Sequence, residues 1–339
     1  MAERMNRQIF LKSRPVGFIK ETDFGFREVP VPGLEDGQVL VRNLYMSLDP
    51  AMRGWMSDRG SYRDAIKIGD VMDTATVGVV AESRNPKYNV GDKVVGFNHW
   101  EDYSVPRGVM LPQVLPEGVP LPLTAFLSVM GTTGLTAYFG LLDVGQPKEG
   151  DTVVVSTAAG AVGSIVGQIA KIKGCRTVGI TGSDEKCAWI KGELGYDAAI
   201  NYKTEDVDAA LRKASPKGVD VYFDNVGGAI LNSTLGQINQ GARVAICGAI
   251  TQYNSMTPQP GPSNYIMLLI KRARMEGFIV LDYLPRFMEG VMQIAMWVME
   301  GKIKYREDIV DGLENAPKHI NKLFDGSNTG KLMVRIASE

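Results

Sequence analysis

The chain contains 339 residues, of which 45% are hydrophobic and 22% charged, a composition typical of globular proteins. One domain usually has about 100 to 200 residues, so two domains are expected. The 37 basic and 38 acidic residues give a net charge of −1 with no basic block, which argues against a nucleic-acid partner. No apolar run reaches the roughly 18 residues of a membrane helix, and residues 1–10 lack the apolar stretch of a signal peptide. We therefore expect a cytoplasmic protein without a membrane partner.

Residues 8–122 have the pattern of short β-strands. Apolar and polar residues alternate in runs bounded by Gly or Pro, as in residues 38–44, and further strands are predicted over 74–82 and 93–97. This pattern favours a barrel or sandwich.

From about residue 126 the pattern changes to alternating helices and strands. A helix is predicted over 126–142. Apolar strands are predicted over 153–155, 177–181, 199–202, 219–224 and 242–248, and helices over 161–173, 186–194, 206–214 and 230–235. Apolar strands separated by helices indicate a parallel sheet covered on both faces.

The last part of the chain adds a few elements. Helices are predicted over 266–273 and 287–298, with a sheet-edge strand at 278–281 between them. A helix over 318–324 and a strand over 331–336 are expected to return to the first domain.

The most informative motif is a dinucleotide-binding fingerprint of the form A-x-G-x-x-G. It follows the apolar strand and opens a helix, and it consists of Ala158, Ala159, Gly160, Ala161, Val162 and Gly163. Gly160 lets the backbone approach a pyrophosphate, Gly163 lets helix and strand pack closely, and the helix N-terminus offers N–H groups to the phosphates. A tight turn without a ligand is the alternative.

The end of the second predicted strand bears on the choice of nicotinamide cofactor. NAD enzymes usually place an acidic residue there to hold the ribose 2′-hydroxyl. Here small residues and Ser183 occupy the tip, and Lys186 lies one helical turn further on, within reach of a 2′-phosphate. Asp184 is a possible acid for NAD, although an acidic residue is also favoured in a first helical turn. We favour NADPH.

Metal-ligating residue types are scarce. The three cysteines, Cys175, Cys187 and Cys247, are widely spaced, and the two histidines, His99 and His319, lie far from them. Neither a disulfide framework nor a zinc ligand set follows from this spacing, so no metal site is predicted. A lone histidine such as His99 is more often structural than catalytic.

Several further blocks carry a family resemblance that runs essentially end to end. They are residues 46–54 (MSLDPAMRG), 182–186 (GSDEK), 201–203 (NYK), 224–228 (DNVGG), 248–254 (GAITQYN), 277–278 (GF) and 328–331 (NTGK). With these blocks and the fingerprint, the chain resembles the zinc-free medium-chain dehydrogenases/reductases that include prostaglandin reductases, alkenal double-bond reductases and bacterial curcumin reductase. Zinc-dependent members of the wider superfamily carry Gly-His-Glu where this chain has Gly69-Asp70-Val71.

The resemblance implies an α/β fold in two domains. Residues 129–301 would form a Rossmann domain, a doubly wound parallel sheet that binds NADPH. Residues 1–128 and 302–339 would form a GroES-like β-barrel catalytic domain. A homodimer is also expected from the resemblance, and an unpaired apolar edge strand would favour it.

The resemblance also implies site residues. Lys186 and Tyr202 would hold the 2′-phosphate, and Asn225 would line the cofactor together with Cys247, Gly248, Ala249 and Ile250. Phe278, Val280 and Asn328 would approach the nicotinamide. Tyr253 would bind the carbonyl oxygen of the substrate.

These expectations define a reaction. Reducing an enal or enone delivers hydride to the β-carbon, and charge accumulates on the carbonyl oxygen as an enolate, which a Tyr253 hydroxyl would stabilise without a metal. Tyr253 as a surface residue is the alternative. Tyr45, Met52 and Tyr62 are candidates for the substrate pocket or for plain core, and Arg53 for a substrate anion or a structural ion pair. The competing functions are NADPH-dependent quinone reduction and NADPH binding without catalysis.

Overall fold

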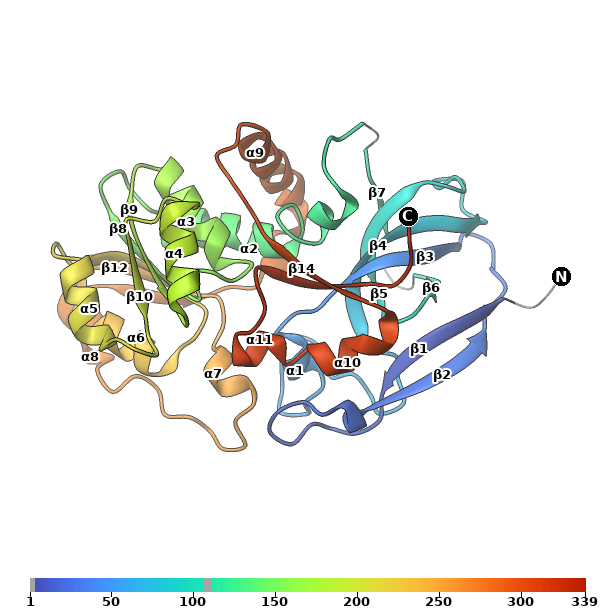
Figure 1. Ribbon diagram of the computed structural model, residues 1–339, viewed down its shortest axis with the longest axis horizontal. Helices are drawn as coiled ribbons and strands as arrows, with labels where there is room; N and C mark the ends of the chain where they lie inside the picture. Colours follow the sequence, from blue (N-terminus) through green and yellow to red (C-terminus); the bar gives the residue numbers. More distant parts are fainter. Residues whose placement is uncertain (1–3, 107–110, 117) are drawn as a thin grey trace. The chain divides into compact units, whose positions relative to one another are not determined.

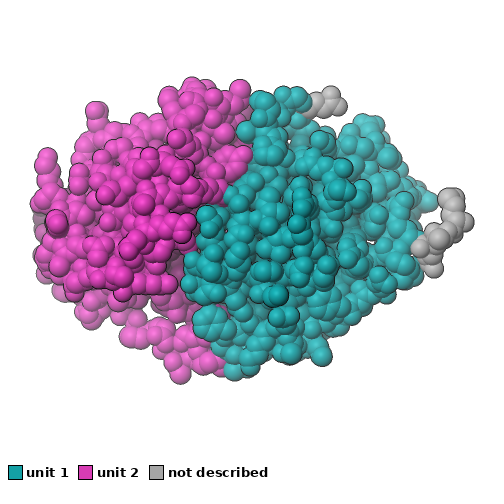
Figure 2. Space-filling model, in the orientation of Figure 1, with its two compact units in different colours: residues 1–127, 307–339 teal, residues 128–306 magenta. Residues whose placement is uncertain are grey.

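The structure, a computed structural model, describes residues 4–106, 111–116 and 118–339. The chain divides into two compact units, one of residues 1–127 with 307–339 and one of residues 128–306 (Figure 2). The sequence predicts the divisions after residues 128 and 301, and the two compact units divide after residues 127 and 306. Residues 303–304 stay with the second unit because the Gln168 side chain hydrogen-bonds both the N–H and the carbonyl of Lys304, each at 2.8 Å, and Ile303 is buried.

The first unit is built from β-strands, as the sequence predicts (Figure 1). A hairpin pairs β1 (Met5–Leu11) with β2 (Phe24–Pro30). A seven-stranded sheet has the order β14-β15-β3-β4-β5-β7, with β6 beside β3. Its strands are β3 (Val39–Ser47), β4 (Asp73–Ser83), β5 (Lys93–His99), β6 (Tyr103–Ser104), β7 (Gln113–Val114), β14 (Glu307–Asp311) and β15 (Lys331–Arg335). The predicted return of the C-terminal strand is therefore found in β15, which pairs antiparallel with β3.

Short helices complete this unit. They are η1 (Glu21–Asp23), α1 (Met52–Trp55), η2 (Leu123–Phe126), η5 (Leu313–Asn315), α10 (Ala316–His319) and α11 (Lys322–Asp325). The single tail helix predicted over 318–324 is wrong, because α10 and α11 divide that segment.

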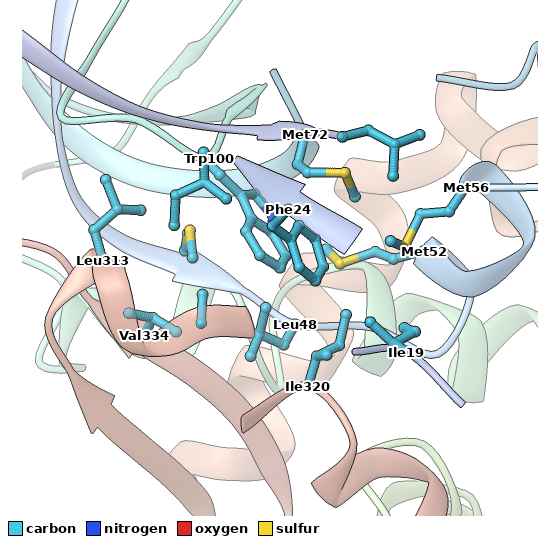
Figure 3. Close-up of a cluster of buried hydrophobic side chains, with 14 of the residues drawn as sticks. Ile19, Phe24, Leu48, Met52, Met56, Met72, Trp100, Leu313, Ile320 and Val334 are labelled. Atoms are coloured by element: carbon cyan, nitrogen blue, oxygen red, sulfur yellow. The ribbon is translucent and has the colours of Figure 1, made fainter. Parts of the chain in front are cut away.

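The main hydrophobic core of the first unit gathers residues from distant parts of the chain (Figure 3). The rings of Phe24 and Trp100 stack with their centroids 5.4 Å apart, and both are nearly inaccessible to solvent. Around them lie Met46, Leu48, Met52 and Met56, and from the C-terminal segment Leu313, Ile320, Leu332 and Val334. Residues of the C-terminal segment from Leu313 to Val334 are thus part of the core of the first unit.

The second unit contains a six-stranded parallel sheet of order β10-β9-β8-β11-β12-β13. This is the strand order of a doubly wound dinucleotide-binding sheet. All six strands are parallel, but the order in which they are added to the sheet reverses between β8 and β11. Its strands are β8 (Thr152–Ser156), β9 (Arg176–Thr181), β10 (Ala198–Asn201), β11 (Val219–Asp224), β12 (Ile238–Ile246) and β13 (Arg274–Gly277). The predicted fold class is confirmed by this sheet together with the β-rich first unit.

Helices precede, connect and follow these strands (Figure 1). They are α2 (Thr132–Phe139), the π-helix η3 (Gly140–Gly145), α3 (Gly163–Ile172), α4 (Asp184–Gly192), α5 (Val207–Ala214), α6 (Gly228–Leu235), α7 (Ile250–Tyr253), α8 (Ile266–Lys271), η4 (Val280–Arg286) and α9 (Phe287–Met299). Apolar side chains of α5 and α6 pack against one face of the sheet, in a cluster with Val154, Tyr222 and Val244. Within the described residues no helix is long and apolar enough to cross a membrane.

Two sequence predictions for this unit are wrong. The continuous helix over 126–142 is interrupted, since α2 begins only at Thr132 and runs on into η3. The edge strand predicted at 278–281 lies earlier, at Arg274–Gly277, and residues from Val280 on form a 3₁₀ helix instead. Phe278 leaves the strand direction because its ring packs against Gly140 and Phe223.

Candidate functional site

The cofactor residues predicted in the second unit share one edge of its sheet. All six strands are parallel, so their carboxyl ends meet at the same edge, and ligands of such sheets bind there, near the point where the strand order reverses. Each predicted residue lies in the loop or the first helical turn that follows one of these strands. They are Ala159, Gly160, Ala161, Val162 and Gly163 after β8, Ser183 and Lys186 after β9, Tyr202 after β10, Asn225 after β11, Cys247, Gly248, Ala249 and Ile250 after β12, and Phe278 and Val280 after β13. The topology therefore brings together residues that are far apart in the sequence.

The turn after β8 is tightly built. Thr157 has φ of 53°, a left-handed conformation that costs a non-glycine residue of order 1–3 kcal/mol and is found mostly at functional sites. Its carbonyl oxygen accepts a hydrogen bond from Gly160 N–H at 2.9 Å. A Cβ at residue 163 would lie 2.3 Å from that same oxygen, so only glycine fits at the start of α3. The helix can then begin directly above the strand with its first N–H groups at the sheet edge, an arrangement that suits a phosphate.

The segment after β9 forms the start of α4. Ser183 is the N-cap, and its hydroxyl accepts a hydrogen bond from the backbone N–H of Lys186 at 3.2 Å. The ring of Tyr202, from the end of β10, lies against Gly182, where an added Cβ would be 3.1 Å from a ring carbon. Ser183, Lys186 and Tyr202 are therefore neighbours at the tip of β9 and β10.

The carboxylate of Asp184 is engaged elsewhere. Its Oδ1 accepts a hydrogen bond from the Asn201 side-chain amide at 2.7 Å. In NAD enzymes the acidic residue at this place instead accepts a hydrogen bond from the ribose 2′-hydroxyl.

Asp224 organises the loops after β11 and β12. It is 1% exposed, and its Oδ1 accepts hydrogen bonds from the Tyr222 hydroxyl at 2.8 Å and from the N–H groups of Val226 and Gly227, each at 2.9 Å. Its backbone carbonyl accepts the N–H of Cys247 at 2.8 Å. Burial raises the pKa of the Cys247 thiol to about 12, with a further contribution from Asp224, so it stays protonated at neutral pH.

Asn225 is fixed to the neighbouring strand β8. Its side-chain amide donates to the carbonyl of Ser156 at 2.7 Å, and its backbone N–H donates to the Ser156 hydroxyl at 2.9 Å. Asn225 therefore lies between β8 and β11, where the strand order reverses.

Tyr253 ends the short helix α7, and it is half-buried. Its hydroxyl accepts a hydrogen bond from the backbone N–H of Ala249 at 3.3 Å. A Cβ on Gly248 would lie 2.9 Å from the same oxygen. The hydroxyl therefore points back over the loop that follows β12.

The predicted residues of the first unit have different surroundings. Met52 is fully buried in the hydrophobic core, the alternative left open by the sequence. Arg53 is 4% exposed, and its guanidinium donates to the backbone carbonyls of Pro15 at 3.1 Å and Gly17 at 3.1 Å. Burial lowers the pKa of Arg53, and the positive charge of the nearby Arg59 lowers it further.

The two tyrosines differ from each other. Tyr45 is nearly buried, in a cluster with Leu44 and Val77. Tyr62 is 48% exposed and borders a hollow of about 330 Å³ lined by residues of the segment 57–65, and its hydroxyl accepts a hydrogen bond from Trp55 Nε1 at 2.9 Å. Of the predicted substrate residues, Tyr62 has the most accessible surface.

Asn328 and His99 belong to the same unit. The Asn328 side chain donates to the carbonyl of Gly330 at 2.9 Å. His99 lies between two carboxylates, with Nε2 3.4 Å from Asp73 and Nδ1 3.2 Å from Glu101. Glu101 is 5% exposed and also accepts hydrogen bonds from Gln8 at 2.6 Å and Ser104 at 2.7 Å. These contacts support a structural role for His99. In the part of the chain that the structure describes, no three His, Cys, Asp or Glu side chains are placed to hold a metal ion.

Comparison with known proteins gives matches over nearly the whole chain. A family model described as the N-terminal domain of oxidoreductase matches residues 7–114, and one described as zinc-binding dehydrogenase matches residues 161–296. An NADPH-dependent curcumin reductase of Escherichia coli is 44% identical, with 99% of each chain covered. The chain belongs to the zinc-free medium-chain dehydrogenase/reductase family.

Two further relatives support this assignment. The NADP(+)-dependent 2-alkenal reductase of Nicotiana tabacum is 40% identical, with 100% of each chain covered. The crystal structure of CurA from Vibrio vulnificus in complex with NADPH is 44% identical and superposes with a TM-score of 0.92, covering 98% of this chain and 100% of that one. The family predicted from the sequence is thus confirmed.

Sequence reasoning missed two residues at the sheet edge. Asp224 and Asn201 lie in blocks that carry the family resemblance, but the sequence assigns no role to either side chain. The Asn201 side chain donates to Asp184, 17 residues away, and such a contact leaves no local pattern in a sequence. Asp224 accepts from its own neighbours Tyr222, Val226 and Gly227, so an acidic residue at the end of an apolar strand was the signal that could have indicated its role.

Proposed function

We propose that this chain reduces the carbon–carbon double bond of α,β-unsaturated aldehydes and ketones with NADPH as the hydride donor. The curcumin reductase and the 2-alkenal reductase cover almost the whole chain at 44% and 40% identity, and CurA of 44% identity binds NADPH. The predictions of an oxidoreductase, of NADPH as its cofactor and of enone reduction are confirmed by these relatives. The single observation that carries the proposal is the end-to-end match to reductases of activated double bonds.

The residues at the carboxyl edge of the sheet fit a 2′-phosphorylated dinucleotide. The turn at Gly160 and Gly163 would receive the pyrophosphate at the start of α3. Ser183, Lys186 and Tyr202 offer a hydroxyl, an ammonium and a phenol at the tip of β9 and β10, all suited to a phosphate. Asn225, Cys247 to Ile250, Phe278 and Val280 would line the remainder of the cofactor, and Asn328 would approach the nicotinamide. When bound, NADPH would supply the hydride, and the protein would orient it.

Tyr253 is our proposed donor to the enolate oxygen. Its position after β12 and its half-buried ring support this role over that of a surface tyrosine. A fixed hydroxyl stabilises the negative charge that develops on the carbonyl oxygen as hydride reaches the β-carbon.

For the substrate, we propose that Tyr62 and the hollow beside it contact the part of the enone that does not react. Tyr62 is 48% exposed, which supports a binding role. Tyr45 is a weaker candidate because it is nearly buried. Met52 and Arg53 are not proposed as substrate contacts. Met52 lies in the hydrophobic core, and the guanidinium of Arg53 donates to backbone carbonyls.

A homodimer is the proposed assembly. Strand β13 is the edge of the sheet, and all four of its residues are exposed. The neighbouring helix α8 exposes Ile266, Leu269 and Ile270, with Leu269 73% accessible. Exposed apolar side chains beside an unpaired strand favour association with a second copy of the chain.

Turnover of a small panel of substrates tests the function. NADPH oxidation would be followed with an alkenal, an aryl enone, a quinone and a saturated aldehyde, with NADH in parallel. We expect NADPH-dependent turnover of the alkenal and the enone. Turnover of the quinone alone would replace the proposal with quinone reduction, and NADPH binding without any turnover would indicate a non-catalytic protein.

A further inference from the structure

The hydrogen bond between Asn201 and Asp184 joins two loops at the tip of β9 and β10. Asn201 is the last residue of β10 and is 4% exposed. Its side-chain nitrogen donates to Asp184 Oδ1 at 2.7 Å, and its side-chain oxygen accepts the N–H of Lys203 at 3.1 Å. Its backbone N–H donates to Glu205 Oε1 at 2.7 Å. A buried amide with both polar atoms engaged holds its partners in one arrangement.

Asp184 is the acidic residue that raises the question of cofactor choice. It lies in the first turn of α4, next to Ser183 and two residues before Lys186. A carboxylate beyond the second strand of such a sheet usually accepts the ribose 2′-hydroxyl and favours NAD. Beside a 2′-phosphate the same carboxylate would be repelled, because two negative charges a few ångströms apart interact unfavourably. The direction in which Asp184 is held therefore bears on the preference between the two cofactors.

We propose that Asn201 is a positioning residue that sets the preference for NADPH over NADH by holding the Asp184 carboxylate toward β10. A hydrogen bond to an ionised carboxylate is stronger than one between neutral groups, so the buried amide can restrain an exposed acidic side chain. The tip of β9 is then left to Ser183, Lys186 and Tyr202. This inference rests on the proposed cofactor, but it is tested by binding alone, without an enone.

The test compares dissociation constants for NADP+ and NAD+ in Asn201→Leu, Asp184→Asn and the double variant. Loss of the amide in Asn201→Leu frees the carboxylate, so NADP+ should bind about tenfold more weakly while NAD+ does not weaken. In the Asp184→Asn background the same change at residue 201 should have little effect on the ratio, because no carboxylate remains to be released. Equal weakening of both cofactors, or an undiminished effect in that background, would overturn the proposal.

Asn239→Leu is the matched control. Asn239, near the amino end of β12, donates to Asp220 Oδ1 at 2.8 Å, so the same kind of bond is removed in the same unit. The amino ends of parallel strands lie at the opposite edge of the sheet from the proposed cofactor site, so this variant should keep the wild-type ratio of NADP+ to NAD+ affinity. A shift of the ratio in Asn239→Leu as large as in Asn201→Leu would show a general effect of destabilisation and would contradict the proposal.

Two further variants keep the test decisive. If Asn201→Leu does not fold, Asp184→Asn alone still tests the proposal. Because the wild-type carboxylate is already held away from the phosphate, replacing it by an amide should leave the NADP+ affinity within about twofold of wild type. A tenfold gain in NADP+ affinity would instead mean that the carboxylate acts on the phosphate in the wild type, against the proposal. Lys186→Ala separates this inference from the cofactor assignment. Lys186→Ala should lower the affinity for NADP+ only. In the wild type, equal affinities for NADP+ and NAD+ would refute the NADPH assignment itself.

Discussion

The backbone of Gly163 passes so close to Thr157 that a Cβ at residue 163 would lie 2.3 Å from the Thr157 carbonyl oxygen. That contact sets how α3 begins above β8. We predict that Gly163→Ala is destabilising by about 1–3 kcal/mol, as overpacking usually is, and that it weakens NADP+ binding because the turn must shift. Thermal unfolding and a binding titration measure the two effects.

Gly192→Ala is the control for this change. Gly192 ends α4, and a Cβ there would meet nothing within 4 Å. Alanine should be neutral there or stabilising by up to about 1 kcal/mol, because it restricts the unfolded chain. Wild-type stability and affinity in Gly163→Ala would contradict the close packing of the fingerprint turn.

Tyr253→Phe tests the enolate donor. Loss of one such donor commonly costs about a hundredfold to a thousandfold in turnover, and the partly solvated site here leads us to expect roughly tenfold to several hundredfold. NADPH affinity should be retained, because the hydroxyl is assigned to the substrate. Tyr265→Phe is the control, since Tyr265 is 66% exposed and precedes α8. Equal turnover of Tyr253→Phe and wild type would remove Tyr253 from the mechanism.

Glu101→Gln tests the buried polar cluster of the first unit. Burial opposes ionisation of Glu101, but hydrogen bonds from His99, Ser104 and Gln8 outweigh it and lower the pKa of this carboxyl. The glutamine side chain has nearly the same size, but its amide N–H groups would face donors instead of acceptors. We therefore expect the free energy of unfolding to fall by about 2–4 kcal/mol at neutral pH.

The pH dependence of this loss follows from the direction of the pKa shift. A carboxyl whose pKa is lowered by folding stabilises the protein above its unfolded value of about 4.3, and that stability disappears as the pH falls through the folded pKa. The difference in the free energy of unfolding between wild type and Glu101→Gln should therefore become smaller in acid. Thermal unfolding over a series of pH values would show this. Glu28→Gln, an exposed change on β2, should differ from wild type by less than about 0.5 kcal/mol throughout. A loss in Glu101→Gln that is independent of pH would contradict the assignment.

Leu269→Glu tests the proposed dimer. Leu269 is 73% exposed on α8, so a charge there should leave the fold intact and still disfavour burial against a second copy. Light scattering after size separation should give a dimer for the wild type and a monomer for Leu269→Glu. Val90→Glu is the control, because Val90 is 69% exposed in a turn of the first unit. A monomeric wild type would end the dimer proposal.

Much of the architecture can be predicted from the sequence. The strands β8, β9 and β11 consist mainly of apolar residues bounded by helices, and all but one residue in β9 and one in β11 are buried, so their pattern reflects their environment directly. Strand β13 could not be predicted in the same way, because Arg274 and Glu276 are exposed and form an ion pair at the sheet edge. The more apolar residues after it, with Phe278 anchored against Gly140, suggested a strand in the wrong place.

The site shows a similar division. The fingerprint turn is predictable because glycine is required by local geometry at Gly163. The arrangement of Asp184 is not, because the amide that holds it comes from the end of another strand. Met52 and Tyr62 illustrate the same limit, since both were candidates for the substrate pocket and only the three-dimensional packing separates the buried one from the exposed one.

The most direct test of enone reduction is to trace the transferred hydrogen. NADPH deuterated at the reactive nicotinamide carbon would be incubated with the enzyme and an aryl enone, and the product examined by NMR and mass spectrometry. Enone reduction would give a saturated ketone with its carbonyl intact and deuterium on the former β-carbon. Deuterium on the carbonyl carbon of an allylic alcohol would contradict it, because the protein would then be a carbonyl reductase.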